Sequence, residues 1–160
     1  SWKKYNSLNK YSIGIEISNP GHEFGYKKFS KKQINSLVKL SSFLIKKYKI
    51  NKKNILGHSD ISPLRKKDPG EKFPWEYLAK RNIGYWHNIK KNTLIKLRYK
   101  KCSKIFKKQF FNNLFKIGYS RVYKKQNEKL LIKAFQRRFR PKLVNGIIDH
   151  ECLKISKNLI

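Results

Sequence analysis

The period of the hydrophobic pattern changes along the chain, and this change limits what the sequence can fold into. In residues 11–18, isoleucines alternate with small or polar residues, which is typical of a half-buried β-strand. Residues 30–48 repeat apolar side chains at helical spacing behind Ser30, a candidate N-cap. Residues 55–58 are short and apolar, as in a second, buried strand. The first part of the chain is therefore predicted to combine strands with a helix.

The last third of the chain shows helical patterns only. Apolar residues recur at helical spacing in residues 104–116 and 127–139, and a third helix is expected over residues 151–159. Residues 88–101 are polar and basic with little periodicity, which is typical of a linker. Residues 102–160 are therefore predicted to form a small three-helix domain, close to the lower size limit of an independently folding unit.

The chain is strongly basic. Its 160 residues include 40 Lys and Arg against 9 Asp and Glu, a formal net charge of +31. Such an excess favours an acidic partner such as nucleic acid, an anionic membrane or an acidic wall polymer. However, 33 of the 40 cations are Lys and 7 are Arg, spread over every segment, so A/T-rich codons explain the basicity equally well. The sequence has no nucleic-acid-binding motif and no apolar run of about 18 residues, so we predict neither a specific nucleic-acid partner nor a transmembrane segment.

The segment whose residues are best suited to catalysis or metal binding is a proline-containing loop after the second predicted strand. His58 and Asp68 stand ten positions apart on it, and imidazole and carboxylate are both common zinc ligands. Lys66 carries an ammonium group that can stabilise an oxyanion beside a metal. Glu16, on the polar side of the first strand, can accept a proton from a metal-bound water. Each residue also has an ordinary interpretation, as a structural histidine, a turn aspartate or a solvated charge, and spacing alone does not decide.

Three stretches carry a resemblance to a known family: Ser12-Ile-Gly-Ile-Glu16, Gly57-His-Ser-Asp60, and Arg65-Lys-Lys-Asp-Pro-Gly70 followed by Phe73-Pro-Trp75. In this order and spacing they resemble the zinc-dependent N-acetylmuramoyl-L-alanine amidase type 2 family over residues 2–87. The resemblance implies an α/β fold, with a mixed sheet flanked by helices. It also implies hydrolysis of the amide bond between N-acetylmuramic acid and the L-alanine of the peptidoglycan stem peptide.

The resemblance assigns roles to the four residues singled out above. It implies that His58 and Asp68 hold Zn²⁺, that Glu16 is the catalytic glutamate, and that Lys66 lies near the scissile carbonyl. The family's first zinc histidine precedes the region of resemblance and has no counterpart in the chain, and His22 is a candidate substitute. Because the chain also contains no methionine, we expect it to be the C-terminal part of a longer amidase or a decayed descendant of one.

A second resemblance covers the C-terminal part. Three stretches are similar, in order, to the three-helix peptidoglycan-binding domain that follows some secreted amidases: Ile117-Gly118-Tyr119, Ala134 to Pro141, and Gly146 to Glu151. Taken singly, these residues have purely structural interpretations, as core aromatics, a turn glycine and a helix cap. Their order is what indicates the domain.

Together the two resemblances imply a domain organisation and a location. Residues 1–87 are predicted to be the C-terminal part of the amidase domain, residues 88–101 a basic linker, and residues 102–160 the wall-binding domain. The expected partner is peptidoglycan or its muropeptides, and the expected location is the cell envelope, in the periplasm or anchored to the outer membrane. The alternative is a non-catalytic wall-binding protein that keeps the groove without a complete metal site.

Overall fold

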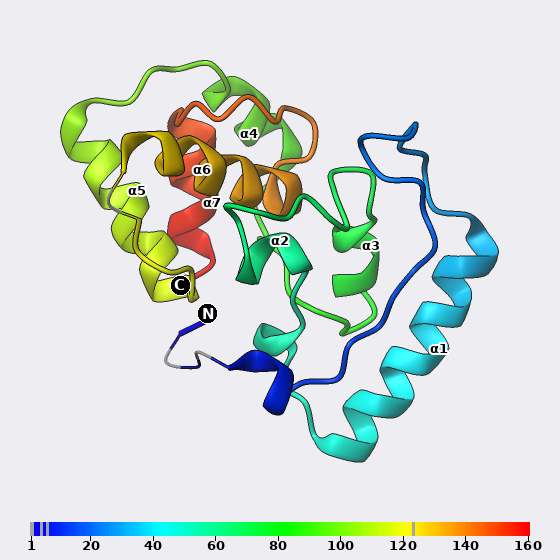
Figure 1. Ribbon diagram of the computed structural model, residues 1–160. Coiled ribbons are helices and arrows are strands. Elements are labelled where there is room, and N and C mark those ends of the chain that lie inside the picture. The colour runs from blue at the N-terminus through cyan, green and yellow to red at the C-terminus, as the bar shows by residue number, and fades with distance from the viewer. Residues whose placement is uncertain (1, 4, 6, 123) are drawn as a thin grey trace.

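The computed structural model describes residues 2–3, 5, 7–122 and 124–160, and its regular elements are helices (Figure 1). In chain order they are α1 (Lys31–Tyr48), α2 (His58–Ile61), α3 (Trp75–Ala79), α4 (Lys91–Leu97), α5 (Lys104–Ile117), α6 (Lys125–Phe139) and α7 (His150–Asn158), with short 3-10 turns at Leu8–Lys10 and Lys52–Asn54. None of the helices in this described part is both long and apolar enough to cross a bilayer.

The predicted mixed sheet is wrong for the described residues, which contain no β-strand. Two isolated bridges are present, one near the N-terminus and one just before α5, and neither extends into a ladder. Residues 11–18 form an irregular segment, and residues 55–57 lead without a strand into α2. The α/β assignment fails because alternation marks an apolar face, whereas a strand also needs a neighbour for its backbone hydrogen bonds. No described segment provides that neighbour.

The helices predicted from periodicity are confirmed. α1 begins where expected: the Ser30 hydroxyl accepts from the Gln33 N–H, and the Gln33 side chain accepts from the Ser30 N–H, which is a complete capping box. α5, α6 and α7 occupy the three segments predicted to be helical in the last third. The Asp149 side chain caps α7 by accepting from the Cys152 N–H. Capping residues and helical apolar stripes were sufficient signals for these elements.

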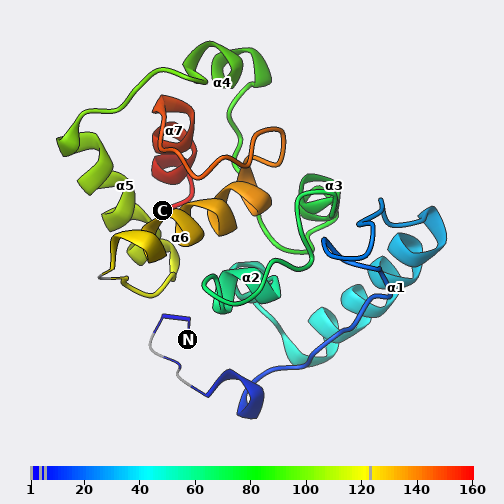
Figure 2. The same cartoon turned by 45° about the horizontal axis from the view of Figure 1, so that its top comes forward.

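The main core lies among the C-terminal helices. α4 and α5 both pack on α7, and α6 packs against α2, while α1 lies at the opposite edge of the molecule (Figures 1 and 2). Phe110, Phe135 and Phe139 are each at most 1% exposed. Residues 91–97, inside the segment predicted to be a linker, form α4, and its Leu94 belongs to this core. A smaller apolar cluster lies under α1 and consists of Ile34, Leu37, Phe73, Trp75, Leu78 and Ile83.

A buried ion pair joins α2 to α6. Asp60 and Arg138 are 1% and 2% exposed, and the carboxylate accepts from the Arg138 guanidinium and, at 2.6 Å, from the Tyr119 hydroxyl. The guanidinium also donates to the Ile55 carbonyl at 2.8 Å and lies 4.0 Å from the centre of the Trp75 ring. Buried charges persist when they are paired and hydrogen-bonded. These contacts therefore fix the position of α2, and with it the loop that follows.

Candidate functional site

His58 and Asp68 meet at the two ends of the loop that contains α2. His58 is the first residue of α2, and the Ser59 N–H donates to the Asp68 carbonyl at 2.9 Å, which closes the loop. His58 Nδ1 lies 3.1 Å from Asp68 Oδ2, and the two side chains are 43% and 59% exposed. The structure thus brings together the two residues predicted to be metal ligands, on a surface that a ligand can reach.

The backbone around these two side chains is closely packed. A Cβ on Gly57 would lie 2.7 Å from Pro69 Cδ and 3.2 Å from the Trp75 ring, so a larger residue would have to displace its neighbours. The Gly57 N–H donates to the buried Asp60 carboxylate at 2.8 Å. The exposed pair is therefore carried by a backbone that buried contacts hold in place.

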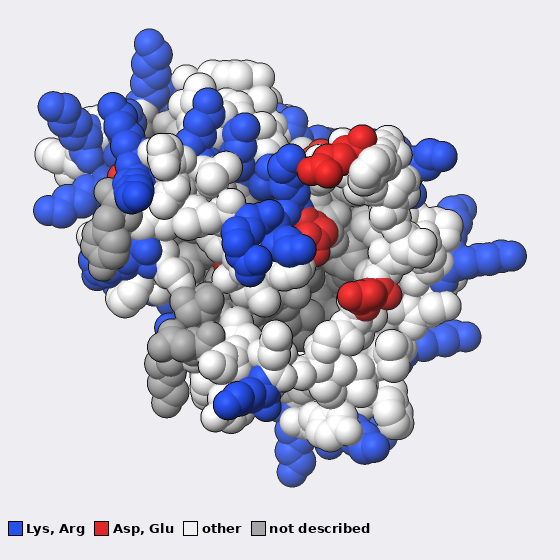
Figure 3. Space-filling model, in the orientation of Figure 1, with Lys and Arg blue, Asp and Glu red and all other residues white. Residues whose placement is uncertain are grey.

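A cavity of about 520 Å³ opens beside the pair, and Glu16, His58 and Asp68 all line it. Glu16 reaches the cavity from the irregular segment of residues 11–18, far from the other two in sequence. Figure 3 shows this side of the molecule: acidic side chains border a hollow near the middle of the face, a group of basic side chains lies beside them, and further basic side chains project from the periphery. Three of the four predicted site residues therefore share one cavity.

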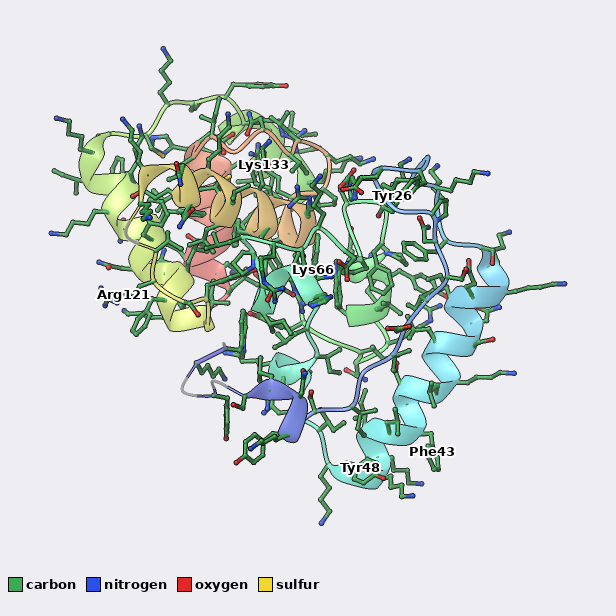
Figure 4. All side chains as sticks on the ribbon, viewed as in Figure 1. Tyr26, Phe43, Tyr48, Lys66, Arg121 and Lys133 are labelled. Carbon is green, nitrogen blue, oxygen red and sulfur yellow. The ribbon has the colours of Figure 1, made fainter. Side chains whose placement is uncertain are left out.

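Lys66, the fourth predicted residue, is placed differently. It follows α2 on the same loop as Asp68 (Figure 4), is partly buried, and is not part of the cavity lining. Its backbone N–H donates to the Ser62 carbonyl at 2.9 Å. Within the described residues its ammonium group forms no ion pair. The ammonium group therefore stands on the loop that also holds Asp68, without a carboxylate partner among the described residues.

The donor set fits a zinc site in part. Neutral imidazole and carboxylate oxygen are ordinary zinc ligands, and the closeness of His58 and Asp68 suits two positions of such a site. Catalytic zinc sites normally use three protein ligands, and no group of three suitable side chains occurs among the residues that the structure describes. His22, the candidate substitute, lines the same cavity, but its Nε2 lies 3.0 Å from Glu71 Oε2. The role of His58 and Asp68 as zinc ligands stays a prediction.

Sequence reasoning missed a polar cluster in the cavity wall. The His22 ring, which contacts Glu71, also stacks on Tyr26 with ring centroids 4.3 Å apart. The Tyr26 hydroxyl donates to the Pro69 carbonyl at 2.7 Å and accepts from the Lys72 N–H at 2.9 Å. Burial raises the pKa of Tyr26 to about 12, so this hydroxyl stays protonated at neutral pH. For Glu71, burial acts to raise the pKa, but the hydrogen bond from His22 and nearby positive charges outweigh it and the pKa is lowered.

One sequence signal for this cluster was available. Gly70 follows Asp68-Pro69 and has φ +84°, and a Cβ there would lie 2.5 Å from the Tyr26 hydroxyl and 2.9 Å from His22 Cε1. A glycine after Asp-Pro indicates a turn. It does not indicate which distant side chains fill the space beside that turn, so the cluster could not be assembled from the sequence.

The chain is similar in sequence and in structure to known amidases. Residues 1–71 match the family model described as N-acetylmuramoyl-L-alanine amidase. The whole chain is 32% identical to N-acetylmuramoyl-L-alanine amidase AmiD of Escherichia coli strain K12 over 167 residues. Among solved structures it resembles AmiD from E. coli in complex with the substrate anhydro-N-acetylmuramic acid-L-Ala-D-gamma-Glu-L-Lys, with a TM-score of 0.86 and 33% identity. It also resembles AmpDh3 from Pseudomonas aeruginosa, with a TM-score of 0.83 and 31% identity.

The similarity covers the chain more completely than it covers the relatives. The alignment to the AmiD sequence uses 100% of this chain and 60% of AmiD, and the two structural alignments use 99% of this chain and 64% and 65% of the relatives. The described helices therefore correspond to part of each relative's fold. The chain therefore spans about 60% of the length of the AmiD sequence it matches, and the family model matches residues 1–71.

Proposed function

We propose that the chain is the catalytic part of an N-acetylmuramoyl-L-alanine amidase, which hydrolyses the amide between N-acetylmuramic acid and L-alanine in peptidoglycan or muropeptides. The observation that carries this proposal is the convergence of Glu16, His58 and Asp68 on one cavity from two separate segments. The AmiD relative is named for this activity, and its solved complex contains a muropeptide substrate.

The proposed site uses a zinc ion held by His58 and Asp68. When bound, zinc polarises a carbonyl group and makes water more acidic. Glu16, in the wall of the same cavity, accepts a proton from the attacking water and returns it to the leaving amine. Lys66 stabilises the negative charge that develops on the carbonyl oxygen, which requires its side chain to turn from the loop toward the cavity.

The C-terminal region has a proposed role in wall binding. Residues 102–160, joined to residues 1–87 through residues 88–101, resemble a peptidoglycan-binding domain in the order of their motifs. An amidase with such a domain acts at the cell envelope, and we propose the periplasm as its compartment. The net charge of +31 favours association with an acidic polymer of this kind.

The activity is tested by following the release of free stem peptide from a muropeptide, with added zinc and with a chelator. We expect zinc-dependent release, and we expect Glu16→Ala to lower turnover by about a hundredfold or more while zinc stays bound. Asp68→Ala should lose the metal. Glu23→Ala is a matched control, since Glu23 is an exposed carboxylate on the same part of the chain and lies outside the cavity lining. Full turnover in Glu16→Ala would refute its role as proton acceptor.

A second candidate function is wall binding without cleavage. The observation in its favour is that the described residues supply two metal ligands and no complete group of three. This function predicts that the chain sediments with intact peptidoglycan whether or not zinc is present, and that no stem peptide is released. Zinc-dependent release would exclude it.

A further inference from the structure

A second cavity of about 330 Å³ adjoins the first, and His22 lines both of them. Besides His22, its lining consists of Glu71, Lys133, Arg137, Pro141 and Val144. Lys133 and Arg137 belong to α6, so a helix of the C-terminal region forms part of a groove that begins at His58 and Asp68. Figure 4 shows Lys133 on α6, Lys66 on the loop after α2, and Tyr26 on the N-terminal segment, three separate parts of the chain.

Arg137 is unusual in this second cavity because its positive charge is buried without a carboxylate at hydrogen-bonding distance. The residue is 9% exposed. Its one ionic contact within the described residues is from Nε to Glu71 Oε2 at 3.9 Å, which is too long for a hydrogen bond. The same Glu71 oxygen lies 3.0 Å from His22 Nε2. Burial lowers the pKa of Arg137, as expected for a guanidinium that lacks close acceptors.

The charges around this cavity do not balance. Lys133 lies one helical turn before Arg137 on α6, is partly buried, and adds a second cation. Glu71 is the one carboxylate in the lining, and it already contacts His22. A guanidinium has five N–H donors in a planar fork that suits a carboxylate. The cavity therefore has donors and positive charge to accommodate one further anionic group.

We propose that Arg137 and Lys133 bind a free carboxylate of the peptide part of the substrate, so that α6 forms the peptide end of the groove. This inference rests on the proposed amidase function. In N-acetylmuramic acid the lactyl carboxyl group is consumed by the amide bond, so the sugar end carries no anion. A γ-linked glutamate keeps its α-carboxylate free, and the substrate in the solved AmiD complex contains such a residue. The position of the cations therefore orients the peptide toward α6 and the sugar away from it.

The test compares two synthetic substrates, N-acetylmuramoyl-L-Ala-D-γ-Glu-L-Lys and the same compound with its peptide carboxylates amidated. The measured quantity is the ratio of kcat/KM for the acidic substrate to that for the amidated one. We expect Arg137→Gln to lower this ratio about tenfold or more, the usual scale for a hydrogen-bonded charge pair, and Lys133→Gln to lower it about threefold. Lys125→Gln is the matched control, since it is an exposed lysine on α6 outside the groove.

The outcomes separate this inference from the proposed function. A lower ratio in both groove variants, with the Lys125→Gln ratio unchanged, supports the inference, whereas an unchanged ratio in Arg137→Gln and Lys133→Gln overturns it. If the unaltered chain hydrolyses neither substrate, the proposed function fails, and binding of the fluorescently labelled peptide L-Ala-D-γ-Glu-L-Lys decides the inference. Binding weakened about tenfold by Arg137→Gln then supports it, and equal binding overturns it. Two variants guard against loss of the fold at the buried Arg137. Arg137→Lys keeps the positive charge, and Lys133→Gln changes a residue that lies nearer the surface.

Discussion

Two regions of the molecule carry regular hydrophobic patterns, but only one of them buries its apolar side chains. In the C-terminal helices, Phe110 and Phe135 have no exposed surface. In residues 11–18, where isoleucines alternate with small and polar residues, Ile13 and Ile15 are 52% and 39% exposed. The two patterns are equally clear in the sequence, so the difference lies in what each element needs in order to form.

A helix closes its backbone hydrogen bonds within itself, and its apolar stripe can then pack on any suitable surface. A strand must find both a hydrogen-bonding neighbour and a surface to cover. The candidate site lies where the two regions meet: Glu16 belongs to the irregular segment, and the His58–Asp68 loop is held by Asp60 and Arg138. The catalytic carboxylate that we propose is therefore carried by the less packed region, and the proposed metal ligands by the better packed one.

The largest effect should come from removing a core aromatic. We expect Phe135→Ala to lower the free energy of unfolding by about 3–5 kcal/mol, because a fully buried ring leaves a cavity. Ile13→Ala, which removes a half-exposed side chain, should cost less than about 1 kcal/mol. Urea denaturation of both variants measures the difference. Similar losses in the two variants would show that residues 11–18 are as well packed as the helices.

The next effect compares two aspartates of the same loop. Asp60→Ala leaves the Arg138 guanidinium buried without its partner, and we expect a loss of about 3 kcal/mol. Asp68→Ala removes an exposed carboxylate and should change stability by less than about 1 kcal/mol. Denaturation curves for the two variants check this order. A small loss in Asp60→Ala would mean that the Asp60–Arg138 contact does not hold α2 in place.

The helices could be predicted from the sequence because their signals are local. Ser30 and Gln33 form the expected capping box, and Asp149 caps α7. The sheet could not be judged in this way, since the partner of a strand is set by distant residues. Asp60 illustrates the same limit within the site loop. The sequence places it beside His58, but its partners Tyr119 and Arg138 are far along the chain, so its structural role was not visible.

The candidate site was predictable where a short motif contains its own geometry. His58 and Asp68 stand on one loop, and the structure brings their side chains to 3.1 Å. The cluster of His22, Tyr26 and Glu71 joins two distant segments through a histidine–carboxylate contact and a ring stack, and no motif spans them. Residue spacing could therefore indicate the pair but not the wall of the cavity around it.

A smaller effect is expected from two glycines that differ in their surroundings. Gly57→Ala would force a Cβ against Pro69 and the Trp75 ring, and we expect a loss of about 1–3 kcal/mol together with weaker zinc binding, because Pro69 adjoins Asp68. A Cβ on Gly14 would point into open space, with no atom beyond its chain neighbours within 4 Å, so Gly14→Ala should leave stability within about 0.5 kcal/mol. Denaturation and zinc titration measure both quantities. Equal effects at the two positions would contradict the close packing of the site loop.

The smallest effect concerns His87, which lies between α3 and α4, on the segment that leads from the site loop to the C-terminal helices. Its Nδ1 is buried without a hydrogen-bond partner among the described residues, and burial lowers its pKa. In the unfolded chain a histidine has a pKa of about 6.5, so below this pH the unfolded state binds more protons than the folded state. The stability that His87 contributes is therefore complete above about pH 6.5 and is lost as the pH falls through the lower pKa of the folded state.

His87→Gln should remove this part of the pH dependence. We expect the free energy of unfolding of the variant to fall less steeply than that of the unaltered chain between about pH 7 and pH 5. At pH 8 the histidine is neutral in both states, so the difference between the two proteins there reports packing alone. Parallel pH profiles would show that the folded chain tolerates a protonated His87, and the segment between α3 and α4 would then be more open to solvent than the burial of His87 indicates.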